Sequence, residues 1–197
     1  MLAELTNFIL AIVADWGYLG IYITMTIESS FIPFPSEVVL IPAGYLAYQN
    51  EMQLHLIFIA ALLGSMSGAF INYFLAYFVG RAFLLRYGKY FFISNETLLK
   101  MESFFQTHGA ISTFTGRLIP GVRQLISIPA GLSKMDLKLF SAYTALGAGI
   151  WSIILIALGY ILGDNQELIK TYLHQITYAL VITIVATLVL YIYKKRV

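Results

Sequence analysis

Two stretches decide the fold: Glu28-Ser-Ser-Phe-Ile-Pro-Phe-Pro-Ser-Glu37 and Gly116-Arg-Leu-Ile-Pro-Gly-Val-Arg123. Each places helix-breaking residues inside a long apolar region and sets charged side chains on both sides of the break. Proline removes a backbone donor and clashes with the preceding helical turn. We therefore expect breaks at Pro33-Phe-Pro35 and at Pro120-Gly121, with a half-helix on either side of each.

The composition is that of an integral membrane protein. The 197 residues are 59% hydrophobic and 11% charged, against about 45–50% and 25% in soluble domains. The chain has no cysteine, which excludes a disulfide-stapled fold and a thiol-based metal or redox site. A net charge of +2 is too small for a nucleic-acid binder. The three histidines are scattered along the sequence, so we expect no metal site and no cofactor.

Three uncharged stretches are long enough to cross a bilayer, because a crossing needs about 20 apolar residues. They cover about residues 53–80, 139–162 and 171–193. The two broken regions, about 17–49 and 108–133, are predicted to be re-entrant hairpins, because irregular backbone at membrane depth survives only inside protein or beside water. The predicted fold class is an all-α integral membrane protein.

The two broken regions repeat one another at an offset of 87 residues, from Pro33 to Pro120 and from Pro42 to Pro129. All five prolines lie in these two regions. We therefore predict one membrane domain, 1–197, with a first repeat over 1–90 and a second over 91–165. The stretch 171–193 adds a C-terminal span, and amphipathic surface helices are expected at 2–14 and 95–106.

The basic residues orient the chain, since Lys and Arg of short loops stay on the cytoplasmic side. If each broken region enters and leaves the membrane on a single face, the first from outside and the second from inside, the N-terminus lies outside and the C-terminus inside. Nine of the twelve basic residues then share the inner side: Arg81, Arg86, Lys89, Lys100, Lys134, Lys138, Lys194, Lys195 and Arg196. The hairpins point at each other from opposite faces, which predicts an inverted repeat with a site near the midplane.

Four charged residues fall at that meeting point: Glu28 and Glu37 beside the first break, and Arg117 and Arg123 beside the second. Charges at membrane depth are costly and are usually paired or functional. One interpretation is a pair of structural salt bridges that lock the hairpins together. The other is a substrate site, in which guanidinium groups bind a phosphate bidentately and desolvated carboxylates exchange protons.

The paired signatures E-x4-P-x-P-S-E and G-R-x2-P-x2-R resemble the DedA family of bacterial membrane proteins, and the resemblance covers roughly residues 10 to 165. That family is similar in expected fold to the eukaryotic VTT-domain scramblases. The resemblance implies a lipid translocase of the bacterial cytoplasmic membrane that moves undecaprenyl phosphate, or a phospholipid such as phosphatidylethanolamine. Glu28 and Glu37 match the acidic positions of that family on the first hairpin, and Arg117 and Arg123 match its essential arginine pair on the second. Together with their chemistry, this makes the arginines the expected phosphate-binding residues and the glutamates the expected ion- or proton-coupling residues.

Three further residues are secondary candidates: Gly116 of the second signature, and Asn72 with Tyr73 in the first full span. Some DedA members carry Asp, or a different spacing, at the acidic positions. Asn72 of this chain is neutral, so the sequence leaves the number of titrating groups open. The sequence leaves open whether H⁺ or Na⁺ is coupled, and whether the chain forms a homo-oligomer.

Three alternatives to an undecaprenyl phosphate flippase remain at this point. A general phospholipid flippase or scramblase would use the same residues. A proton-coupled ion antiporter would use Glu28 and Glu37 but leave the arginines without an anion. A lipid-pyrophosphate phosphatase needs a nucleophile or an activated water, for which the second hairpin offers Ser127. We favour a transporter over an enzyme.

Overall fold

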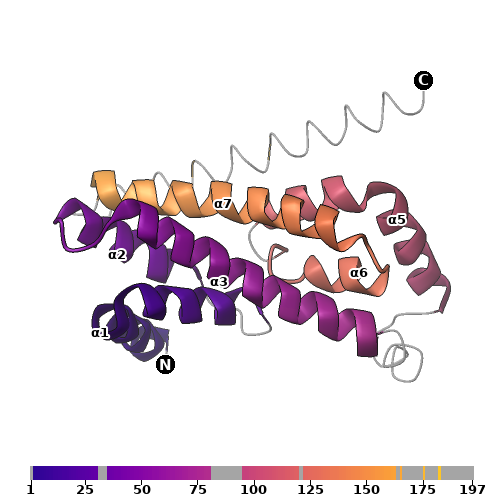
Figure 1. Ribbon diagram of the computed structural model, residues 1–197, viewed down its shortest axis with the longest axis horizontal. Coiled ribbons are helices and arrows are strands. Elements are labelled where there is room, and N and C mark those ends of the chain that lie inside the picture. Colours follow the sequence, from indigo (N-terminus) through magenta and orange to yellow (C-terminus); the bar gives the residue numbers. More distant parts are fainter. Residues whose placement is uncertain are drawn as a thin grey trace.

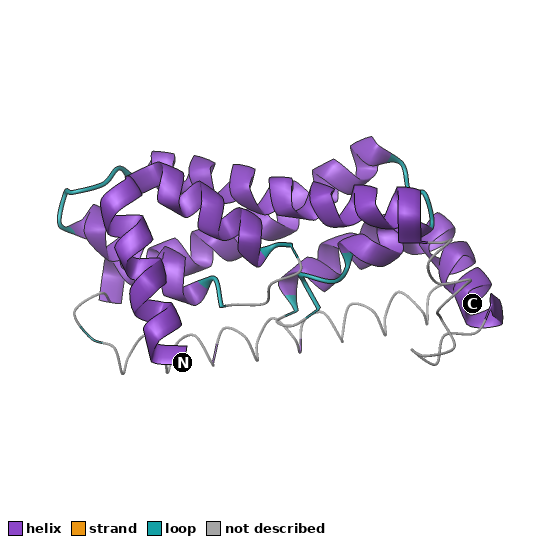
Figure 2. Cartoon of the chain, turned by 90° about the horizontal axis from the view of Figure 1, so that it is seen from below, coloured by secondary structure: helices purple, strands orange, loops and turns teal. Residues whose placement is uncertain are grey.

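The computed structural model describes residues 2–30, 35–80, 95–119 and 122–162, with 165, 175 and 182. This part of the chain is helical and contains no strand (Figures 1 and 2), so the predicted all-α class is confirmed. The elements are α1 (Leu2–Glu28), α2 (Glu37–Tyr48), α3 (Leu54–Leu75), the π-helical η1 (Ala76–Gly80), α5 (Asn95–Leu118), α6 (Ser127–Leu132) and α7 (Leu137–Leu162).

Two of the three predicted spans are continuous helices. The segment Leu54–Gly80, which joins α3 to η1, has 27 residues, and α7 has 26. At 1.5 Å per residue each reaches roughly 40 Å, which exceeds the ~30 Å hydrocarbon core of a bilayer. The third predicted span, 171–193, lies outside the described residues.

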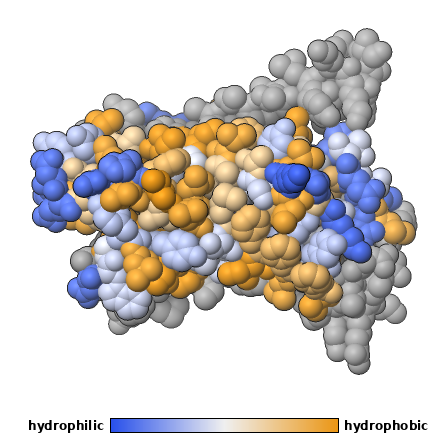
Figure 3. Space-filling model, viewed as in Figure 1, coloured by the Kyte–Doolittle hydropathy of each residue, from blue (hydrophilic) through white to orange (hydrophobic). Residues whose placement is uncertain are grey.

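An apolar surface covers the middle of the molecule. Large apolar side chains on α3 and α7 are exposed, among them Ile59, Leu63, Leu146, Ile153 and Ile161. Figure 3 shows hydrophobic residues over most of the middle of the visible face, and hydrophilic residues gathered toward its two ends. A soluble protein rarely exposes so large an apolar area, whereas lipid tails would cover it.

The first broken region forms two helical arms, as predicted. Gly17 interrupts α1 with φ 54° and ψ −127°, a backbone conformation that favours glycine. No heavy atom lies within 4 Å of a Cβ built there, so the backbone alone requires glycine. The first arm ends at Glu28, and α2 forms the second arm. Pro35 is exposed just before α2, and Pro33 lies outside the described residues.

The second broken region differs from expectation on its N-terminal side. The predicted surface helix 95–106 and the first arm of the hairpin are one continuous helix, α5. Gly109 does not break it, and a Cβ there would lie 3.1 Å from the Met135 sulfur, in close packing. The second arm, α6, has six residues, and its Pro129 sits in the first turn, where a backbone donor is not needed. Pro120 and Gly121 lie outside the described residues.

Each short arm packs on the long helix of the other half. In Figure 1, α3 and α7 run along the long axis, with α1 and α2 toward one end and α5 and α6 toward the other. The α2 arm packs on α7, and the α6 arm packs on α3. A Cβ on Gly44 would overlap the backbone oxygen of Ile156, and a Cβ on Gly131 would overlap that of Tyr73. These two glycines are related by the 87-residue offset, so the contacts are those that a duplication would produce.

Candidate functional site

A buried ion pair joins the two broken regions. Glu28 is the last residue of α1, and Arg123 lies between α5 and α6. The Arg123 Nη2 atom lies 2.7 Å from the Glu28 Oε1 atom. Glu28 is 2% exposed and Arg123 9%. Breaking one partner of such a pair is strongly destabilising, because the other charge stays buried without compensation.

The Glu28 carboxylate accepts two further hydrogen bonds. The hydroxyl of Ser29 donates to Oε2 at 2.9 Å, and the side-chain amide of Gln124 donates to Oε1 at 3.4 Å. The donors come from both breaks, because Ser29 follows α1 and Gln124 follows Arg123. Both oxygens of this carboxylate are therefore satisfied although water is largely excluded.

Two neutral side chains hold Arg123 from other directions. Its Nη2 atom donates to the Ser36 hydroxyl at 2.8 Å. The guanidinium carbon lies 5.3 Å from the centroid of the Trp151 ring, within the range of a cation–π contact. The indole N–H of Trp151 donates to the same Ser36 hydroxyl at 3.3 Å. Ser36, Arg123 and Trp151 thus form one connected group.

Arg117 is the second buried cation of the site. It is 3% exposed at the end of α5, and its Nη2 atom donates to the Ser127 hydroxyl at 2.7 Å. Its Nε atom has no hydrogen-bond partner among the described residues. A cavity of about 20 Å³ lies beside these charges, and both polar and apolar residues line it: Met25, Glu28, Ser29, Ser65, Arg117, Arg123, Ala148, Trp151 and Ser152. That volume suits about one water molecule, so the site is closed to a phosphate group in this conformation.

The secondary candidates lie close to the site. The amide nitrogen of Asn72 donates to the backbone oxygens of Ser29 at 3.2 Å and Gln124 at 3.1 Å, which ties both breaks to α3. The hydroxyl of Tyr73 donates to the backbone oxygen of Met135 and so holds the turn before α7. Gly116 lies against Ile126, whose side chain would be 2.7 Å from an added Cβ.

Glu37 does not join the other three charges. It opens α2, is half-buried, and forms no ion pair with any residue that the structure describes. Its carboxylate stands in the first turn of α2, where the helix dipole favours negative charge. The structure therefore brings together Glu28, Arg117 and Arg123, and leaves Glu37 beside the group.

Sequence reasoning missed Ser36, Gln124 and Trp151. Ser36 and Gln124 stand next to predicted charges, but uncharged polar residues are common in breaks. Trp151 lies in an apolar helix, where an aromatic residue is usually a packing residue. Trp151 lies 28 residues after Arg123 in the sequence, and only the folded structure shows that the two side chains are in contact.

Two observations bear on whether the site could act as a phosphatase or hold a metal ion. Ser127, the candidate nucleophile, accepts a hydrogen bond from Arg117, and a guanidinium cannot serve as its general base. Within the described residues, no group of three His, Cys, Asp or Glu side chains is placed to hold a metal ion.

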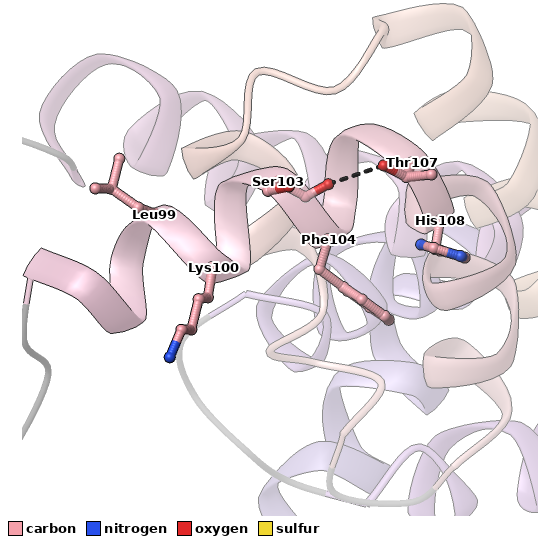
Figure 4. A pocket seen from close by; sticks show the side chains of 6 residues that line it. All are labelled: Leu99, Lys100, Ser103, Phe104, Thr107 and His108. Carbon is pink, nitrogen blue, oxygen red and sulfur yellow. Dashed lines mark hydrogen bonds between the residues drawn. The ribbon is translucent and has the colours of Figure 1, made fainter.

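A second hollow runs along α5. A groove of about 470 Å³ is lined by Leu99, Lys100, Ser103, Phe104, Thr107 and His108 (Figure 4). The Thr107 hydroxyl donates to the Ser103 backbone oxygen at 3.1 Å, and the Phe104 and His108 rings are stacked with centroids 5.1 Å apart. All six residues belong to one helix, and no member of the ion pair lines the groove. It accounts for the mixed polar and apolar pattern predicted for this segment.

Residues 34–161 of this chain match the VTT domain family. That range contains Ser36, Arg117, Arg123 and Trp151. The chain belongs to the VTT-domain family. Protein DedA of Escherichia coli also matches, with 26% identity over 165 residues, covering 78% of this chain and 75% of DedA. The resemblance to the DedA family is therefore confirmed, and this VTT-domain chain is a membrane protein.

Other relatives carry different names. An uncharacterised membrane protein of Bacillus subtilis, YkoX, is 39% identical over 91% of this chain and 80% of its own length. Undecaprenyl phosphate transporter A of the same organism is 34% identical over 99% of this chain and 97% of its own length. A Lactococcus lactis protein named alkaline phosphatase-like is 36% identical over 96% and 92%. No solved structure matches the chain.

Proposed function

We propose that this VTT-domain protein moves an anionic lipid phosphate, undecaprenyl phosphate, between the leaflets of the bacterial cytoplasmic membrane, where the lipid is reused as a carrier. The similarity to undecaprenyl phosphate transporter A over nearly the whole chain supports this substrate. The observation that carries the proposal is the buried Glu28–Arg123 pair, which bonds the two broken regions beside the second buried cation, Arg117.

In this proposal Arg117 and Arg123 bind the phosphate, since guanidinium groups match phosphate oxygens in geometry and charge. The resting Glu28 carboxylate occupies the anion position on Arg123. A proton on Glu28 removes its charge, weakens the ion pair and frees Arg123 for the lipid phosphate. Loss of that proton after release restores the pair. Transport is thereby coupled to the proton gradient, or to sodium if Na⁺ takes the place of H⁺.

The proposed arrangement in the membrane is an inverted repeat. The two broken regions re-enter from opposite faces, the N-terminus lies outside and the C-terminus inside. The closed site then lies near the midplane, and the lipid tail stays in the bilayer while the phosphate crosses. Glu37, half-buried next to Ser36, is proposed as a second coupling carboxylate.

The phosphatase is kept as a second candidate because two relatives from Lactococcus lactis are named alkaline phosphatase-like. The contact of Ser127 with Arg117 speaks against a serine nucleophile in this conformation. An ion antiporter would leave two buried arginines without a substrate anion. A purely structural ion pair accounts for the burial of Glu28 but gives Arg117 no acidic partner of its own.

The test is lipid translocation in proteoliposomes. A labelled polyprenyl phosphate and a labelled phosphatidylethanolamine are compared, with and without a pH gradient, for wild type and the Arg117→Ala/Arg123→Ala double variant. We expect selective movement of the polyprenyl phosphate, faster with the gradient and reduced to the protein-free rate in the double variant. Release of inorganic phosphate is measured in the same vesicles.

Each other result contradicts the proposal in a different way. Equal movement of both lipids would replace it with a general scramblase. Arginine-dependent release of phosphate would replace it with the phosphatase. If wild type moves neither lipid, the proposal that this protein transports a lipid phosphate is wrong.

Glu28→Gln is expected to abolish the response to the pH gradient. Glutamine keeps the shape and an acceptor oxygen for Arg123 but cannot exchange a proton. The ratio of transport rates with and without the gradient should fall to about one. Rates are normalised to folded protein, because the variant leaves the buried Arg123 without its counter-charge and is expected to be less stable than wild type. Glu51→Gln, in an exposed loop, is the matched control and should retain the wild-type ratio. An unchanged ratio in Glu28→Gln would remove Glu28 from the coupling mechanism.

A further inference from the structure

Among the residues that the structure describes, Arg123 has three side-chain partners, of which one is charged. Glu28 pairs with it at 2.7 Å, Ser36 accepts its hydrogen bond at 2.8 Å, and its guanidinium carbon lies over the Trp151 ring, 5.3 Å from the ring centroid. A substrate anion would replace the carboxylate as the charged partner of Arg123. A guanidinium carries five N–H donors, so it can bind an anion while one N–H still bonds the Ser36 hydroxyl and the indole ring stays in contact. The partners therefore divide into one charged partner and two neutral ones.

The geometry of the neutral partners suits a support for Arg123. An aromatic ring takes the face of a guanidinium and leaves its edge N–H groups for anions. The Trp151 N–H also donates to Ser36 at 3.3 Å, so each neutral partner fixes the other. Ser36 is fully buried and Trp151 is 3% exposed, so water does not compete for these contacts.

The internal repeat distinguishes these contacts of Arg123. Ser36 and Arg123 are 87 residues apart, the offset of the proposed duplication, so they are equivalent positions of the two halves. In an inverted-repeat transporter the two end states exchange the conformations of the halves. A contact between equivalent positions maps onto itself in that exchange and need not break. The Glu28–Arg123 contact maps instead onto Thr115 and Ser36, and the Trp151–Arg123 contact maps onto Gly64 and Ser36. By this criterion only the Ser36–Arg123 contact is common to both states.

We propose that Ser36 is a positioning residue that keeps the Arg123 guanidinium in place throughout the transport cycle, and that Trp151 supports both side chains in the conformation seen here, while the lipid phosphate exchanges with the Glu28 carboxylate. This inference rests on the proposed function. It adds that binding energy is not spent on moving Arg123, because the guanidinium is already oriented when the phosphate arrives.

The experiment measures translocation of polyprenyl phosphate at increasing mole fraction in the membrane, which yields a half-saturating fraction and a maximal rate. Ser36→Ala is made in two backgrounds, wild type and Glu28→Gln. Because the support acts independently of Glu28, we expect the half-saturating fraction to rise about five-fold or more in both backgrounds, as for loss of a hydrogen bond to a charged group. Ser141→Ala, whose hydroxyl bonds only its own helix backbone, is the matched control.

Trp151 supplies a graded second series. Trp151→Phe keeps an aromatic face and loses the N–H, whereas Trp151→Leu loses both. We expect an intermediate rise in the half-saturating fraction for Phe and a larger one for Leu. Trp16→Phe, at an exposed tryptophan, should match wild type. Thermal unfolding of each variant identifies any that is merely unfolded, and the conservative Trp151→Phe keeps the series informative in that case.

The outcomes separate this inference from the proposed function. A wild type without saturable transport contradicts the function itself. If wild type transports but the Ser36→Ala effect disappears in the Glu28→Gln background, the contact serves only the resting ion pair and the inference is wrong. Equal half-saturating fractions for Trp151→Phe, Trp151→Leu and wild type would also overturn it.

Discussion

Arg123→Lys is expected to keep the charge of the site and still lose at least about ten-fold in the rate of lipid phosphate transport. The Nη2 atom meets Glu28 and Ser36 at 2.7 and 2.8 Å, and the guanidinium carbon lies over the Trp151 ring, 5.3 Å from its centroid. A lysine ammonium is a smaller point charge without the spread of the guanidinium group, so it cannot keep all three contacts together. It would also bind phosphate through single contacts rather than as a fork.

Initial rates in proteoliposomes, normalised to the amount of folded protein, measure this loss. Lys138→Arg, the reverse exchange at an exposed residue, is the control for changing a basic side chain and should transport as wild type does. Rates of Arg123→Lys near those of wild type would show that charge alone suffices, and would contradict recognition by the guanidinium fork.

Gly159→Ala is expected to destabilise the protein severely. A Cβ at this position in α7 would overlap the backbone oxygen of Ile41 in α2. A backbone atom cannot rotate away as a side chain can, so the helices must separate, at a cost of about 3 kcal/mol. For a chain of this size, that corresponds to a fall of roughly 6 °C or more in the midpoint of thermal unfolding.

The matched control is Gly149→Ala in the same helix. The nearest atom to its Cβ would be Phe58 Cζ at 3.7 Å, an ordinary contact. Because alanine favours a helix over glycine by up to about 1 kcal/mol, this variant should unfold at or above the wild-type temperature. Thermal unfolding in detergent micelles, followed by loss of the monodisperse species, compares the two. Equal midpoints for Gly149→Ala and Gly159→Ala would refute the close approach of α2 and α7.

This helix crossing also positions the site. Ser36 immediately precedes α2, and Trp151 lies in α7. The close contact of α2 with α7, at Gly44 with Ile156 and at Gly159 with Ile41, brings the Ser36 hydroxyl within reach of the indole N–H. The glycines therefore contribute to the support of Arg123 without touching it.

The sequence by itself determined the local features of this protein. Apolar length predicted α3 and α7, because a span is defined by the hydropathy of consecutive residues. The Pro33-Phe-Pro35 segment predicted a break between α1 and α2, since a proline removes a backbone donor and clashes with the preceding turn. Glu28, Arg117 and Arg123 were candidates because a charge in an apolar region needs a partner. The continuous helix over 95–118 was missed, because glycine at 109 permits either a break or close packing.

Only the tertiary structure decided how the charges pair. Glu28 and Glu37 flank the same break and are equivalent by sequence, yet Glu28 meets Arg123 while Glu37 stands at the start of α2. Ser36 and Trp151 lie 115 residues apart and share a hydrogen bond. The packing of α2 on α7 and of α6 on α3 brings these partners together. Such packing depends on side-chain shape across distant segments, which no local pattern of residues encodes.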